Sequence, residues 1–239
     1  MRLPPVAAAL AVFGLGAAGC VAVPRGADEG PEPAPPRTVS VAEVCGGTLL
    51  SADAGKALER VLGSTEFRVS KPEDDRSAAD LAEVMERAYR SGAEVRNMPS
   101  GVCLIKGKHE GNPKATMRFT AGRGHAPLPD DAPGANRTGV TVHRGVTDHT
   151  IGFDCVSVRV GSTAKVPLRV TAEFDARGAH DARDGATRAA DQLALVHSGA
   201  RSVAAELACE SGGGLPDRYA DLERFAAESK ASATPAPPQ

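Results

Sequence analysis

Five cysteines offer the most direct chemistry in this chain, because a thiol can form a disulfide or accept a covalent group. Four of them fall into two sequential pairs along the sequence. In an oxidising compartment they could form two disulfides, for which three connectivities are possible. We predict that Cys45 pairs with Cys103 and that Cys155 pairs with Cys209, all four being structural. The fifth, Cys20, has no partner and needs a separate explanation.

Cys20 follows a segment with the plan of a secretory signal. Arg2 precedes an apolar stretch from Val6 to Leu15, which is shorter than most membrane spans, and small residues follow up to the cysteine. The sequence Ala17-Ala18-Gly19-Cys20 resembles a bacterial lipobox, although Ala17 stands where most lipoboxes carry leucine. This resemblance implies that Cys20 takes diacylglycerol and that a lipid anchors the mature chain. An ordinary signal peptide, cleaved at the small residues, is the alternative.

The overall composition agrees with that predicted location. Proline, alanine and arginine are frequent and lysine is rare. Together with the signal segment, this composition resembles that of the lipoproteins of high-GC actinobacteria such as Streptomyces. The resemblance implies an extracytoplasmic, membrane-anchored location, and it carries no function for individual residues.

The sharpest match to a catalytic motif is Ser162-Thr163-Ala164-Lys165, which has the S-x-x-K spacing of penicillin-binding proteins and serine β-lactamases. In those enzymes the lysine helps to activate the serine, the motif begins a buried helix, and separate S-x-N and K-T-G elements complete the site. Here the four residues fall in a predicted hairpin turn, and neither companion element follows. A solvated turn is the favoured interpretation. An envelope-acting serine hydrolase or penicillin-interacting enzyme using Ser162 and Lys165 is the alternative.

Histidines and acidic residues match no recognised metal-site spacing. His143 and His149 with Asp148 could supply ligands. However, two residues six apart on one strand are separated by about 20 Å, unless the chain turns between them. We therefore expect surface or loop histidines, and we expect no metal and no cofactor.

The charge balance excludes nucleic acid as a partner, and the low aromatic content disfavours carbohydrate without excluding it. The 28 basic and 30 acidic side chains nearly cancel, so no basic footprint for nucleic acid exists. Tryptophan is absent and aromatic residues make up only 3% of the chain, which disfavours stacking on sugars or single-stranded bases.

The periodicity of apolar residues predicts one folded body. We expect a signal peptide over residues 1–19, a proline-rich tether over 20–38, a single α+β domain over 39–230 and a disordered tail over 231–239. Helices are predicted from Ser51 to Gly63, from Ser77 to Gly92, from Ala186 to Cys209 and from Tyr219 to Glu228. Strands are predicted at Phe67–Ser70, Val102–Ile105, Ala115–Thr120, Ile151–Val160 and Val166–Phe174, with a long loop over Gly122–Gly139.

Pro167 predicts that the last of these strands lies at a sheet edge, because proline cannot donate a ladder hydrogen bond. The resulting fold is an antiparallel sheet with two or three helices packed against it and two disulfides.

These patterns favour a non-enzymatic binding or accessory module of the cell envelope. Its partners would be the membrane, through lipid on Cys20, and an envelope protein or small ligand. The alternatives are the serine hydrolase and a small-solute receptor, for which two α/β lobes are expected. A cavity of about 300 Å³ or more with convergent polar groups would favour a small ligand, and a solid core would favour protein contact.

Overall fold

The computed structural model describes residues 37–69, 75–93, 103–108, 113–124, 139–145, 148–178 and 185–222. All of them belong to one unit, Pro35–Gln239. The helices are α1 (Ala52–Leu62), α2 (Ala78–Ser91) and α3 (Gly185–Glu206), with short turns η1 (Val44–Gly47) and η3 (Glu210–Gly214). The strands are β1 (Arg37–Ser40), β2 (Glu66–Val69), β3 (Cys103–Gly107), β4 (Lys114–Arg123), β5 (Thr141–Arg144), β6 (Asp148–Cys155) and β7 (Leu168–Arg177).

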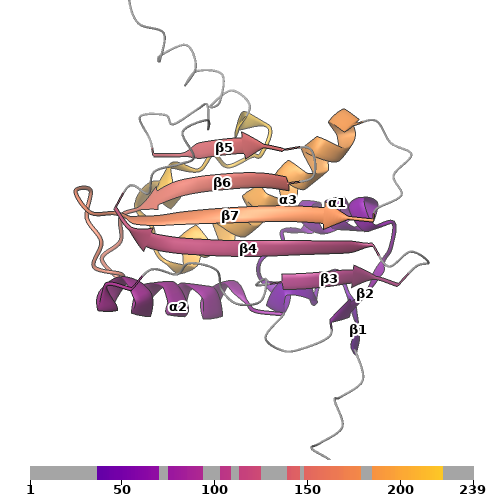
Figure 1. Cartoon of the computed structure of the whole chain (residues 1–239), viewed down its shortest axis with the longest axis horizontal. Helices are drawn as coiled ribbons and strands as arrows, with labels where there is room; N and C mark the ends of the chain where they lie inside the picture. The colour runs from indigo at the N-terminus through magenta and orange to yellow at the C-terminus, as the bar shows by residue number, and fades with distance from the viewer. Residues whose placement is uncertain are drawn as a thin grey trace, which may run out of the picture. The chain divides into compact units, whose positions relative to one another are not determined.

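The strands form one antiparallel sheet in the order β1-β2-β3-β4-β7-β6-β5 (Figure 1). Side chains alternate along the central strands. Met117 and Phe119 of β4, for example, are buried beneath the helices, whereas Thr116 and Arg118 face the other side and are partly exposed. The three helices pack against the sheet, as predicted, so the fold is α+β with an apolar layer between helices and strands.

The first two helices begin and end at the predicted residues. The Ser51 hydroxyl accepts a hydrogen bond from the Ala54 N–H, and Ser77 forms a capping box with Asp80. Gly63 and Gly92 end the two helices in the left-handed conformation, which glycine adopts without a steric penalty. These boundaries are therefore set by local sequence.

The longest helix, α3, packs closely on the sheet through a glycine. A Cβ atom placed on Gly199 would lie 2.5 Å from Met117 Sδ and 3.2 Å from Phe119 Cζ. Only a residue without a side chain fits there, which brings the helix backbone against β4.

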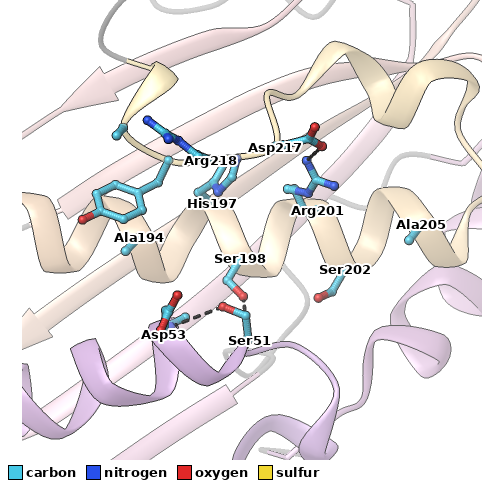
Figure 2. A pocket seen from close by; sticks show the side chains of 13 residues that line it. Ser51, Asp53, Ala194, His197, Ser198, Arg201, Ser202, Ala205, Asp217 and Arg218 are labelled. Carbon is cyan, nitrogen blue, oxygen red and sulfur yellow. Dashed lines mark hydrogen bonds and ion pairs between the residues drawn. The ribbon is translucent and has the colours of Figure 1, made fainter.

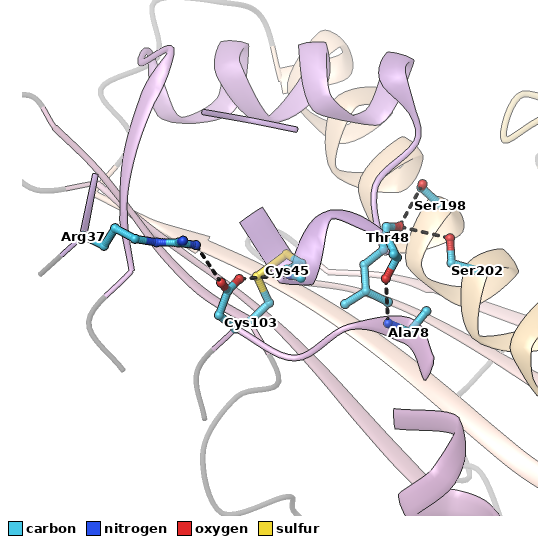
Figure 3. The surroundings of a disulfide bond; sticks show 10 residues. Arg37, Cys45, Thr48, Ala78, Cys103, Ser198 and Ser202 are labelled. Atoms are coloured by element: carbon cyan, nitrogen blue, oxygen red, sulfur yellow. Dashed lines mark hydrogen bonds and ion pairs between the residues drawn. A yellow bond between two sulfur atoms is a disulfide. The ribbon is translucent and has the colours of Figure 1, made fainter. Parts of the chain in front are cut away.

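Both predicted disulfides are present. Cys45 pairs with Cys103, which joins η1 to β3, and Cys155 pairs with Cys209, which joins the end of β6 to the residue before η3. The Cα–Cα distances of 5.2 and 5.0 Å are ordinary for disulfides. Around the first one (Figure 3), the Thr48 hydroxyl accepts a hydrogen bond from the Ala78 N–H, which ties this corner to the start of α2.

The predicted hairpin is correct in its pairing and wrong in its length and position. β6 ends at Cys155, β7 begins at Leu168, and these two residues are register partners. Val158, predicted within the first strand, lies in the connecting loop and is 93% exposed. β7 lies between β4 and β6, so the edge position inferred from Pro167 was wrong. The proline stands just before the paired residues and therefore interrupts no ladder hydrogen bond.

Two strands were not predicted. β1 begins at Arg37, inside the segment 20–38 predicted as a tether, because Arg37 and Thr38 pair with β2. β5 pairs with β6 through only four residues. The predicted signal peptide, Cys20, most of the predicted loop Gly122–Gly139 and the C-terminal tail lie outside the described residues. Within the described ranges, no helix is long and apolar enough to cross a membrane.

Candidate functional site

A pocket of about 510 Å³ lies along one side of α3 (Figure 2). The other walls come from the N-terminal end of α1 and from residues 217–220, which follow η3. Residues from three separate parts of the sequence therefore surround it.

The α3 side of the pocket consists of small and polar residues at helical spacing. Positions three or four apart in a helix share one face, and this face carries Ala194, His197, Ser198, Arg201, Ser202 and Ala205. Alanine and serine side chains leave the space that a larger residue would fill. The longer polar side chains on this face, His197 and Arg201, reach the opposite wall.

The carbonyl of Pro216 connects α3 to the wall formed by residues 217–220. Pro216 O accepts hydrogen bonds from His197 Nε2 and from Arg201 Nη1, each at 2.9 Å. Because a carbonyl only accepts, this contact assigns the imidazole proton to Nε2. Arg201 Nη1 also donates to Asp217 Oδ1 at 2.7 Å. Leu215, which directly precedes Pro216, is buried and anchors this wall in the core.

The floor of the pocket joins α1 to α3 through serine hydroxyls. Ser198 Oγ accepts a 2.7 Å hydrogen bond from the Ser51 N–H and donates to Leu49 O at 3.1 Å. Ser202 Oγ donates to the same carbonyl at 3.3 Å. These bonds fix the distance between the two helices and thus the width of the pocket.

The surroundings of His197 lower the pKa of its imidazole. Burial is the largest influence and lowers its pKa below the ordinary value of 6.5, and nearby Arg201 lowers the pKa further. The Pro216 carbonyl and Asp217 act in the opposite direction but do not reverse the shift.

Among the described residues that line the pocket, Ser198 and His197 do not form a nucleophile–base pair. Ser198 follows His197 in α3, but its hydroxyl bonds Leu49 and Ser51, whereas the histidine bonds Pro216. Nucleophilic catalysis by serine requires a base within hydrogen-bond reach of the hydroxyl.

Ser162 also has a structural environment. Its side chain is buried, donates to Cys155 O at 2.8 Å and accepts from the Ser157 N–H at 2.9 Å. Lys165 is exposed, and no hydrogen bond joins it to Ser162 in the described ranges. The motif thus lies in a turn, as predicted, but the expectation that its serine is solvated was wrong. The hydroxyl stabilises the loop after β6.

The chain does turn between His143 and His149, since they lie on the paired strands β5 and β6. His143 pairs with Thr150, so the two imidazoles are on opposite faces of the sheet. His143 is exposed, but His149 is only 1% exposed, so the expectation of a surface histidine was wrong for His149. His149 and the buried Ile151 are two residues apart on one strand and share a face, and this alternation is the sequence signal for the burial of His149. In the described part of the chain, no group of three or more potential ligands is placed to hold a metal ion.

No protein-family model matches the chain, and no curated protein or solved structure matches it significantly. The residues of the pocket were not identified from sequence, because each is unremarkable in its own segment. The small-residue face of α3 is the one signal that could have indicated part of it. Cys20, the predicted lipidation site, lies outside the described residues.

Proposed function

We propose that this chain is a lipid-anchored, extracytoplasmic binding protein of the bacterial cell envelope, and that the pocket along α3 holds a small polar ligand. The observation that carries the ligand-binding part is the pocket itself. Its volume of about 510 Å³ exceeds the roughly 300 Å³ expected of a small-molecule site, and polar groups from three segments converge on it.

The extracytoplasmic part of the proposal is supported by the cysteines. Both predicted disulfides are present, and such bonds persist in oxidising compartments. They account for four of the five cysteines and leave Cys20, which follows the predicted signal segment. Mass spectrometry of the mature protein tests this part. We expect a chain that starts at Cys20 and carries diacylglycerol, and an unmodified start elsewhere would contradict the anchor.

Binding is favoured over catalysis because the serine hydroxyls of the pocket that form hydrogen bonds across it are held by backbone groups and not by a described histidine or carboxylate. His197 and Arg201 both use Pro216 O, and Ser198 and Ser202 both use Leu49 O. The strands described here also form one sheet, whereas a two-lobed solute receptor would have two.

Native mass spectrometry of protein purified from its own membranes tests the pocket. We expect a co-purifying small molecule as an added mass on the wild type. Ala205→Phe places a large ring at an exposed position of the pocket wall and should remove that mass. Ala79→Phe makes the same change at an exposed position of α2 that does not line the pocket, and should retain it. No added mass on any variant, or an equal mass on Ala205→Phe, would contradict the proposal.

A further inference from the structure

The polar groups of the pocket differ in how deeply they lie. Its two carboxylates belong to the rim, since the side chains of Asp53 and Asp217 are 91% and 93% exposed. Arg201 is 41% exposed, and His197 and Ser198 are buried. Water therefore screens the negative charges more than it screens the arginine. The inner part of the pocket favours a ligand with negative charge.

Arg201 has hydrogen-bonding capacity left for such a ligand. A guanidinium has five N–H groups, and the contacts to Pro216 and Asp217 both use Nη1. Nε and Nη2 form no hydrogen bond to a described residue. These two nitrogens present parallel N–H groups that fit both oxygens of a carboxylate or two oxygens of a phosphate.

The ion pair between Arg201 and Asp217 is weak. An ion pair with a side chain as exposed as Asp217 contributes little to stability, because water solvates the carboxylate equally well when the pair is broken. Figure 2 shows Asp217 beside Arg201 at the wall opposite α3. The wall itself does not depend on this pair, since the Pro216 carbonyl is held by His197 as well.

Resting on the proposed function, we infer that the ligand is a small oxyanion, a carboxylate or a phosphate, bound by Nε and Nη2 of the Arg201 guanidinium beside Asp217, which uses Nη1. Arg218 contributes less, because it is 72% exposed and has Asp221 at 3.5 Å. The buried part of the α3 face, which carries His197 and Ser198, then contacts the remainder of the ligand.

Nuclear magnetic resonance titration of the disulfide-bonded protein at low ionic strength tests this inference. Citrate and inorganic phosphate separate the two sources of oxyanion, and glucose and putrescine serve as neutral and cationic probes. We expect at least one anion to shift the amide signals of Arg201, Ser202 and Ala205, and we expect no shift from glucose or putrescine. Shifts caused only by the neutral or cationic probe would overturn the ligand class while leaving the pocket as a binding site.

Three substitutions test the role of Arg201. Arg201→Gln should weaken binding of the anion roughly tenfold or more, as expected for a lost charge-assisted bidentate contact. Arg218→Gln, the matched control on the same rim, should weaken binding by less than about threefold, because an exposed charge acts mainly at long range. Asp217→Asn should tighten binding, because it removes a negative charge beside the bound anion and leaves Arg201 in place.

Equal losses in both arginine variants, or weaker binding in Asp217→Asn, would overturn the inference. If Arg201→Gln does not fold, the affinity of Asp217→Asn for the anion tests the inference by itself. If no probe shifts the pocket signals, the inference fails, and the mass on the natively purified protein decides separately whether the pocket binds a ligand.

Discussion

Replacing His149 by leucine should stabilise the protein at neutral pH. The imidazole is 1% exposed, and neither ring nitrogen has a hydrogen-bond partner among the described residues. A buried polar group without a partner costs about 1 to 3 kcal/mol. Leucine has a similar size and no polar atom, and a misfit of shape in the core typically costs less than about 1.5 kcal/mol. We therefore expect a gain of about 1 kcal/mol in the free energy of unfolding.

The same substitution should flatten the pH dependence of stability. Burial, followed by the charge of Arg144 on the neighbouring strand, lowers the pKa of His149 below 6.5, while Asp148 has a smaller, opposite effect. The unfolded chain then binds a proton that the folded chain does not, so wild-type stability falls as the pH drops below about 6.5. One such group contributes a slope of up to about 1.4 kcal/mol per pH unit, until the pH reaches the folded pKa.

Urea unfolding at several pH values between 7.5 and 5 measures both effects. His143→Leu is the matched control, because it changes an exposed histidine on the paired strand. This control should lose stability with nearly the wild-type slope, because His143 makes the smallest contribution to the lowered pKa of His149, and His149→Leu should lose less. A destabilised His149→Leu at pH 7.5, or a slope equal to that of the wild type, would refute the reasoning.

Three further changes have expected sizes. Replacing Cys155 and Cys209 together by alanine should cost about 4 kcal/mol in urea unfolding, as expected for opening a loop with a sequence separation of 54; an unchanged midpoint would contradict the disulfide. Gly199→Ala should cost roughly 1 to 3 kcal/mol because its Cβ would meet Met117, whereas Gly185→Ala, with open space around it, should cost nothing measurable by thermal unfolding. Ser77→Ala should cost about 1 kcal/mol through loss of the helix cap, and equal hydrogen exchange at the start of α2 in both proteins would contradict this.

Local signals were sufficient for the bounds of the first two helices, whereas α3 ends at Glu206 and not at the predicted Cys209. A serine cap and a terminal glycine act on the backbone within one turn, so Ser51 and Ser77 could be assigned from their neighbours alone. The two cysteine pairs followed from their order in the chain and from the predicted compartment, and the structure confirmed both.

The position of each strand in the sheet required the tertiary structure. Alternation of apolar residues indicates that a strand has a buried face, but it does not say which strands lie on either side. β7 pairs with β4 and β6, and its central position became apparent only when both neighbours were known. Pro167 was a misleading signal, because β7 begins one residue after it, at Leu168, and the proline therefore lies outside the ladder.

The pocket depended most strongly on the fold. Ser51 and Ser198 are 147 residues apart in sequence and bond across the pocket floor, and Arg201 reaches Pro216 only because the chain returns after η3. Composition, spacing and local propensity determined the helices, the cysteine pairs and the predicted address at Cys20. Tertiary packing alone decided which polar side chains meet, because such contacts depend on how distant segments are held against one another.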